Sequence, residues 1–122
     1  MLAYVCLGTN DLPRATRFYD ELLQPLGAKH IWETERFVAF GNNPKRPLLL
    51  LIKPYDSSPA TVGNGTMVAL ATTSKEQVEA VHQKALALGG KDEGAVGPRG
   101  DNFYAGYFRD LEGNKIVVCF TG

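Results

Sequence analysis

The sequence predicts an α+β fold: two β-α-β-β-β modules that form a curved mixed sheet with the helices outside. Strand patterns and helical patterns follow the same order in each half of the 122-residue chain. The two halves correspond at a constant spacing of 63 positions, which indicates an internal repeat. The paired positions are Tyr4 and Met67, Asp11 and Ser74, and Gly27 and Gly90. Each half is too short to bury much core alone, so we expect the two to complete one domain.

The first half begins with a β-rich strand at residues 2–8. Residues 9–11 have side chains that cap helices, and Pro13 suits a first helical turn. Apolar residues then recur at helical spacing, so we predict a helix with Pro25 in its last turn and Gly27 closing it. The apolar positions are Leu12, Ala15, Phe18, Tyr19, Leu22, Leu23 and Leu26.

Three further strands complete the first half, at residues 29–34, 36–40 and 48–53. Residues 41–44 read Gly-Asn-Asn-Pro and predict the turn between the last two strands. Pro, Ser, Gly, Asn and Asp dominate the following segment, residues 55–66, which predicts a linker. We therefore expect a single domain over residues 1–122, with modules at 1–54 and 67–122.

The second half repeats this order from a strand at residues 67–71. Ser74 followed by Gln77 three residues later is typical of a capping box at a helix start. Gly89 and Gly90 predict the helix end, and residues 91–96 form a weak strand pattern. The apolar helix positions are Val78, Val81, Ala85 and Leu88.

The clearest local pattern is a β-hairpin at residues 103–120, where two apolar, aromatic and β-branched runs flank a polar turn. Gly113 can adopt the positive φ that such a turn requires without steric strain. We expect Asp110 and Asn114 to cap the turn. Tyr104 and Tyr107 differ by three positions, so they point to opposite faces of their strand.

Composition excludes several classes of function. Acidic and basic residues number 13 each, so no electrostatic footprint for nucleic acid is present. No apolar run approaches the roughly 20 residues that span a bilayer, and the N-terminus lacks a basic signal region. Cys6 and Cys119 each lie in an apolar strand, which predicts buried free thiols in a reducing compartment and hence a cytoplasmic location.

Four short motifs stand at defined places in this pattern. They are Asn-Asp-Leu-x-x-Ala at residues 10–15, Phe-Tyr at 18–19, Leu-Gly at 26–27 and Arg-Asp-x-x-Gly-Asn-Lys-Ile at 109–116. Together with the repeat, they resemble the vicinal oxygen chelate superfamily over essentially the whole chain. That superfamily includes glyoxalase I, extradiol dioxygenases, fosfomycin-resistance enzymes and bleomycin-resistance proteins.

The resemblance implies a bowl between paired modules that holds a divalent metal, with ligands on the first and last strand of each module. The matching positions in this chain are Tyr4, Met67, Val117 and either Leu49 or Leu50. None of these side chains is a carboxylate or an imidazole, the ligands that such ions take. We therefore predict no metal site and no cofactor.

Strand alternation places a second set of residues on the bowl face of their strands, and these are the predicted ligand-binding residues. They are Tyr4, Cys6, Met67, Tyr107, Val117 and Cys119. Ala69, Phe103 and Arg109 share these faces, whereas Val5 and Leu7 point to the helix. The set predicts an apolar pocket with few polar groups. The alternatives are that these side chains only fill the space between modules, and that the Tyr107 hydroxyl only meets water at a rim.

Other reactive residues have simpler interpretations. No basic residue adjoins either cysteine in the sequence to lower the pKa of its thiol, which favours structural thiols over nucleophiles. We expect His82 to be a partly buried helix residue and His30 to lie on the surface of its strand or at the bowl rim. Arg99-Gly100-Asp101 is interpreted as a chance tripeptide; the alternative is a loop whose Arg99 and Asp101 control entry to the bowl.

The sequence is consistent with three alternative functions. The first is a metal-free protein, similar to bleomycin-resistance proteins, that binds a small amphipathic or aromatic molecule. The second is a metal-dependent lyase or dioxygenase with reassigned ligands. The third is a dimeric interaction module without a ligand. We also expect a homodimer, because each module leaves a sheet edge that a partner could cover.

Overall fold

Capping side chains set both helix starts in the computed structural model, which describes residues 1–122. Helices α1 (Leu12–Leu22) and α2 (Lys75–Ala87) begin at Asp11 and Ser74. Each capping oxygen accepts a hydrogen bond from the N–H three residues later, at 3.1 Å and 3.2 Å. The Gln77 side chain reaches back and accepts a bond from the N–H that precedes the cap, at 2.8 Å. The capping box therefore forms, shifted by one residue.

The first helix ends earlier than its apolar pattern predicts. Pro25 has no N–H to continue the α-helical ladder, so the chain continues after α1 as a short 3₁₀ turn, η1 (Gln24–Leu26). Gly27 closes that turn with φ 69°. In the second half the left-handed residue is Gly89, with φ 102°, and not the Gly90 that the repeat pairs with Gly27. The two helix ends therefore differ by one residue.

The chain divides into two compact units, residues 1–61 and 62–122, and the boundary falls within the expected linker. The first unit contains α1 and a four-stranded mixed sheet in the order β1-β4-β3-β2. Its strands are β1 (Tyr4–Gly8), β2 (Lys29–Glu33), β3 (Phe37–Gly41) and β4 (Leu48–Ile52). β1 runs parallel to β4, and the other neighbours are antiparallel.

The second unit repeats this topology with α2 and the order β5-β8-β7-β6. Its strands are β5 (Val68–Ala71), β6 (Lys91–Pro98), β7 (Tyr104–Arg109) and β8 (Lys115–Phe120). β5 runs parallel to β8, and β6, β7 and β8 are antiparallel neighbours. β6 is longer than the predicted weak strand and is irregular at two places opposite β7. The predicted α+β class and both β-α-β-β-β modules are confirmed, with the strands divided into two four-stranded sheets.

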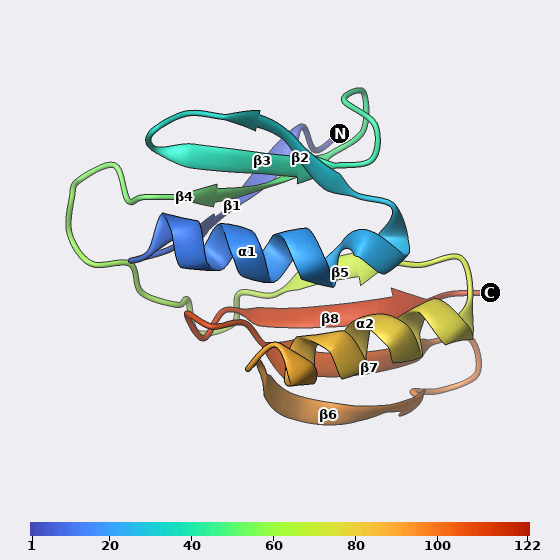
Figure 1. The fold of residues 1–122 in the computed structure, drawn as a ribbon. Helices are drawn as coiled ribbons and strands as arrows, with labels where there is room; N and C mark the ends of the chain where they lie inside the picture. Colours follow the sequence, from blue (N-terminus) through green and yellow to red (C-terminus); the bar gives the residue numbers. More distant parts are fainter. The chain divides into compact units, whose positions relative to one another are not determined.

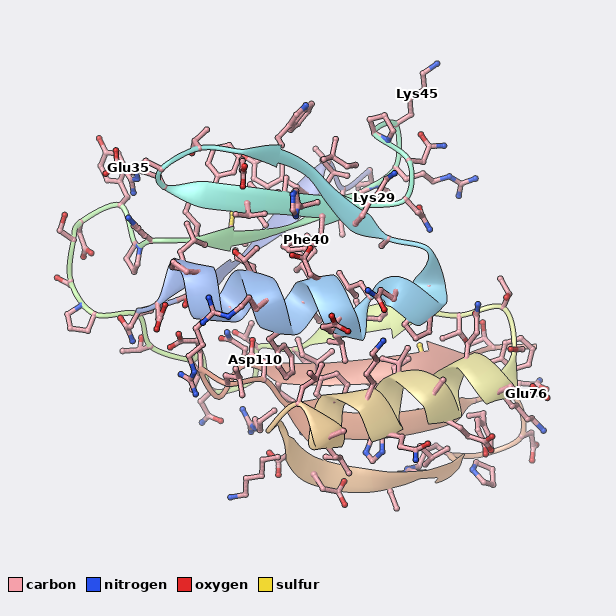
Figure 2. The ribbon with its side chains drawn as sticks, viewed as in Figure 1. Lys29, Glu35, Phe40, Lys45, Glu76 and Asp110 are labelled. Atoms are coloured by element: carbon pink, nitrogen blue, oxygen red, sulfur yellow. The ribbon has the colours of Figure 1, made fainter.

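Each helix covers one face of the sheet in its own unit (Figure 1). In the first unit, Tyr19 of α1 packs against Phe40 of β3, with ring centroids 6.2 Å apart, and Figure 2 labels Phe40 on β3 above α1. In the second unit, α2 buries Val78 and Val81 completely. Phe108 and Ile116, on β7 and β8, are equally buried. Burying a side chain of this size contributes roughly 1.5–3 kcal/mol, so these contacts hold each helix on its sheet.

The β7–β8 turn forms as predicted, at the end of the strands where Figure 2 labels Asp110. Asp110 Oδ1 accepts hydrogen bonds from the N–H groups of Glu112 and Asn114, at 3.0 Å and 2.9 Å. Its Oδ2 accepts a bond from the Asn114 side-chain amide at 3.0 Å. Gly113 has φ 94°, a conformation that glycine adopts without strain.

No helix of the chain has both the length and the apolar character to cross a bilayer.

Candidate functional site

The face of the second sheet opposite α2, here called the far face, carries a small apolar cluster. Ala105, Val117 and Cys119 form its buried floor, and Phe103 and Tyr107 pack against that floor. The strand register places these side chains together, because Val117 lies opposite Tyr107 and Cys119 lies opposite Ala105. Tyr107, Val117 and Cys119 of the predicted set therefore share one surface. Tyr104 points the other way and donates a hydrogen bond to Glu79 of α2 at 2.8 Å.

Two cationic side chains lie over the Tyr107 ring. The Arg99 guanidinium carbon is 5.5 Å from the ring centroid, and Lys115 Nζ is 5.7 Å away. Arg99 also donates to the carbonyl oxygens of Ala95 and Gly97 on β6, at 2.6 Å and 2.9 Å. These bonds hold the Arg99 side chain against the preceding strand, β6. The far face therefore combines an aromatic ring with two positive charges.

A pocket of about 500 Å³ adjoins this cluster, between residues 62–67 and the turn end of β7 and β8. Met67, Arg109 and Lys115 line it. Met67, of the predicted set, is 44% exposed. Arg109 follows Tyr107 by two residues on β7, so both point to the far face as predicted.

Arg109 is already partnered within this face. Its Nε donates to Glu93 Oε1 at 2.5 Å, and its Nη1 donates to the carbonyl oxygen of Gly113 at 3.0 Å. The hydrogen bond from Arg109 holds the pKa of the Glu93 carboxyl below its ordinary value, and the charges of Arg109, Lys115 and Lys91 lower this pKa further. Glu93 thus stays ionised and neutralises one of the nearby cations.

The far face of the first sheet carries the other two predicted residues, Tyr4 and Cys6. They lie opposite Leu48 and Leu50 of β4, whose side chains form a buried cluster with Ala39. Tyr4 is 56% exposed, and Cys6 is also exposed. The prediction that both thiols are buried is therefore wrong for Cys6. The helix covers only one face of this sheet. Alternate side chains of an edge strand point to the other face, where the helix does not cover them.

Cys119 is buried, as predicted, and both cysteines are free. Partial desolvation raises the pKa of the Cys6 thiol and of the Cys119 thiol above the ordinary value. A raised pKa leaves the thiol protonated at neutral pH. Both thiols are therefore poor nucleophiles.

Strand pairing identifies the fourth position at which the resemblance implies a metal ligand. Cys6 pairs with Leu50, and Ala69, its equivalent in the repeat, pairs with Val117. Leu50 is thus the equivalent of Val117, whereas Leu49 points to the helix side, opposite Phe40. The four positions hold a phenol, a thioether and two aliphatic side chains: Tyr4, Met67, Leu50 and Val117. This donor set does not fit a divalent metal.

No group of three or more His, Cys, Asp or Glu side chains in the chain is arranged to hold a metal ion. His30 lies on the surface and contacts Asp20 at 3.0 Å. His82 is buried more fully than predicted, at 6% exposure, and its Nε2 lies 3.2 Å from both Asp92 Oδ1 and the Tyr107 carbonyl oxygen. Both histidines are therefore engaged in structural contacts.

Sequence reasoning missed Lys115 and the position of Arg99 over Tyr107. Lys115 precedes Val117 and Cys119 at a spacing of two, so alternation alone could have placed it on the far face. Arg99 follows β6, whose pairing with β7 is irregular at Gly94 and Gly97, so simple alternation could not place Arg99 over Tyr107. Asp101, considered together with Arg99, instead lines a separate pocket of about 250 Å³ near Lys75 and Phe120.

Comparison with known proteins gives the same fold. The family model described as Glyoxalase/Bleomycin resistance protein/Dioxygenase superfamily matches residues 1–118. A solved glyoxalase/bleomycin resistance protein from Albidiferax ferrireducens T118 is 31% identical, and the alignment covers 100% of this chain and 99% of that chain with a TM-score of 0.91. No match was found among curated proteins.

More distant solved structures share the fold alone. A glyoxalase/bleomycin resistance protein/dioxygenase family enzyme from Burkholderia phytofirmans PsJN is 17% identical, with 98% of each chain covered and a TM-score of 0.78. A lactoylglutathione lyase from Agrobacterium tumefaciens is 22% identical, with 98% of this chain and 92% of that chain covered and a TM-score of 0.70.

Proposed function

Because this chain belongs to the glyoxalase/bleomycin resistance protein/dioxygenase superfamily, we propose that it binds a small amphipathic or aromatic molecule without a metal ion. The observation that carries this proposal is the far face of the second sheet, where an apolar floor, an aromatic ring and an adjoining pocket occur together. Sites for small molecules usually combine apolar walls with a few polar groups. On the far face of the first sheet, Tyr4 and Cys6 offer a similar exposed surface.

Binding can be tested with 2-naphthol and 2-naphthoate, followed by amide chemical shifts of the ¹⁵N-labelled protein. We expect saturable shifts at β7, β8 and residues 62–67. Shifts confined to other parts of the chain, or no saturable shift with either compound, would contradict the proposed site. The variants Met67→Asp and Met67→Leu probe the pocket directly.

Met67→Leu conserves an apolar side chain of similar volume and should retain binding. Met67→Asp places a carboxylate beside Lys115 and Arg109, where it can take the place of a bound polar group. We expect weaker binding in the Asp variant. Because Met67 is 44% exposed, both variants should fold, which thermal melting checks. Equal affinities in the two variants would remove Met67 from the site.

The metal-free part of the proposal rests on the donor set at Tyr4, Leu50, Met67 and Val117. A divalent ion bound at any of these side chains would exchange hydration for poor ligands, which is unfavourable. The test is elemental analysis of protein purified without chelator, with thermal melts in added zinc, nickel, manganese and iron(II). Close to one equivalent of metal, or a melting shift that saturates at micromolar metal, would favour the metal-dependent enzyme instead.

We also propose that two copies of the chain form a homodimer. β1 and β5 are edge strands, each with one side unpaired, and Tyr4 and Met67 beside these edges are exposed apolar residues. A partner strand or surface could cover them. Sedimentation equilibrium at micromolar concentration tests this, and a single species of 13.3 kDa would exclude the dimer.

The two free cysteines support the expected cytoplasmic location.

A further inference from the structure

The far face of the second unit carries more positive than negative charge. Arg99, Arg109 and Lys115 all lie on it, and Glu93 is the carboxylate that forms an ion pair there. Glu93 is bound to Arg109. The Arg99 guanidinium bonds only to backbone carbonyls, and Lys115 Nζ has no carboxylate within ion-pair distance. Glu93 is bonded to Arg109 and interacts with the charge of Lys115 only at longer range, so one carboxylate offsets three cations and the face keeps a net positive charge.

The position of Lys115 joins the charge to the pocket. Its ammonium group lies over the Tyr107 ring, and the same residue lines the pocket of about 500 Å³ beside Met67. A molecule in this pocket can therefore contact Lys115 and Met67, and Lys115 links the pocket to the neighbouring Tyr107 ring. Asp110, at the start of the turn that precedes Lys115, is buried, and both of its carboxylate oxygens accept hydrogen bonds within the turn.

These features distinguish between classes of aromatic ligand. A cationic ligand would be repelled by the net positive charge of Arg99, Arg109 and Lys115, which Glu93 offsets only in part. A neutral ligand could accept a hydrogen bond from Lys115 but would bring no negative charge to it, so that bond would be weaker than one to an anion. An anion would form a charge-assisted bond to the ammonium group while its apolar body covers the ring.

We propose that the second unit binds an organic oxyanion, with the oxyanion at Lys115 and an apolar or aromatic body against Tyr107 and Met67. This deepens the proposed function by naming the class of ligand, and it rests on that function. Arg99 acts from the β6 side of the ring, where its guanidinium adds to the positive potential of the face. The site needs no metal to attract the anion.

Three matched probes test this proposal: 2-naphthoate, the neutral 2-naphthamide and the cationic (2-naphthyl)methylammonium. Isothermal titration calorimetry measures their affinities at low salt. We expect 2-naphthoate to bind about tenfold more tightly than 2-naphthamide, and the cation to bind least. The affinity for 2-naphthoate should fall as salt is added, while that for 2-naphthamide stays constant.

Two variants locate the effect. Lys115→Gln should reduce the preference for 2-naphthoate to near parity. Lys75→Gln is a matched control, because Lys75 also lies over a tyrosine ring, that of Tyr104, at 5.3 Å, but away from this pocket. It should keep the full preference. Thermal melting confirms that both variants are folded.

The outcomes separate the two proposals. If 2-naphthamide binds the wild-type protein as well as 2-naphthoate does, the small-molecule proposal stands and the anion proposal is wrong. If the preference survives Lys115→Gln, or is lost only in Lys75→Gln, the anion does not bind at Lys115. If none of the three probes binds, both proposals fail.

Discussion

The Nε2 atom of His82 lies 3.2 Å from the carbonyl oxygen of Tyr107. A buried histidine on α2 thus holds the backbone of the tyrosine that packs against the far-face cluster. The same nitrogen lies 3.2 Å from Asp92 Oδ1 on β6. Because both partners accept hydrogen bonds, Nε2 carries the proton. Asp92 Oδ1 also accepts a bond from Gly94 N–H at 3.0 Å, so His82 ties α2 to both β6 and β7.

His82→Ala should destabilise the protein by about 1–3 kcal/mol, because it removes the donor that bonds the Tyr107 carbonyl oxygen and Asp92 and opens a cavity under the sheet. Urea unfolding measures the change. His30→Ala is the matched control, since His30 also contacts an aspartate, Asp20, but at the surface. Exposed pairs contribute about 0–1 kcal/mol. Equal losses in the two variants would show that burial of the His82 contacts has no energetic consequence.

Gly106 allows this approach of His82 to the sheet. A Cβ atom on Gly106 would lie 2.8 Å from a ring carbon of His82 and 2.8 Å from a methyl carbon of Val96. Gly106→Ala should therefore destabilise the protein by about 1–3 kcal/mol. Gly97→Ala, where the nearest atom is the Arg99 side chain at 3.5 Å, should have a much smaller effect.

The double variant His82→Ala with Gly106→Ala adds a test of the cause. Removing the ring also removes half of the clash, so the combined loss should be smaller than the sum of the single losses. Additive losses would show that Gly106 is required for another reason.

The pair of Arg109 and Glu93 predicts a pH effect. The pKa of Glu93 is lower in the folded protein than in the unfolded chain. The pair therefore makes its full contribution to stability when the pH is above the pKa that Glu93 has in the unfolded chain. That contribution is lost as the pH falls through the lowered pKa. A ¹³C titration of the Glu93 carboxyl should show its pKa moving up in Arg109→Gln and staying in place in Lys75→Gln. A Glu93 pKa that does not respond to Arg109→Gln would remove Arg109 as the cause.

The two thiols should differ in reactivity. Cys6 is exposed and Cys119 is buried, so iodoacetamide should modify Cys6 first and Cys119 only after unfolding in urea. Because the pKa of the Cys6 thiol is raised, its alkylation should be slow at neutral pH and should increase toward higher pH than for an unperturbed thiol. Mass spectrometry of the variants Cys6→Ser and Cys119→Ser assigns each site. Fast alkylation of native Cys119 would contradict its burial.

Local signals in the sequence were sufficient for much of the fold. The caps at Asp11 and Ser74 and the turn at Asp110 involve hydrogen bonds between residues within four positions of one another, so short motifs predict them. Strand alternation separated Tyr4 from Leu7 correctly, since successive side chains always point to opposite faces. The family resemblance depended on the same motifs and on their repetition.

Long-range pairing decided the rest. Leu49 and Leu50 are indistinguishable by composition, and only the pairing of β1 with β4 shows that Leu50 shares the far face with Cys6. The exposure of Cys6 depends on what covers its strand, which an apolar neighbourhood in the sequence does not report. The helix end before Pro25 shows that a missing N–H outweighs a continuing apolar pattern.

The sequence by itself therefore determined the order of the elements, the two modules and the residue types that each strand offers, because these depend on interactions between near neighbours. Only the tertiary structure brought Arg99, Tyr107 and Lys115 together, from the segment after β6, from β7 and from β8. Their contact depends on strand register and on the irregular pairing of β6, which arise from hydrogen bonds between distant parts of the chain.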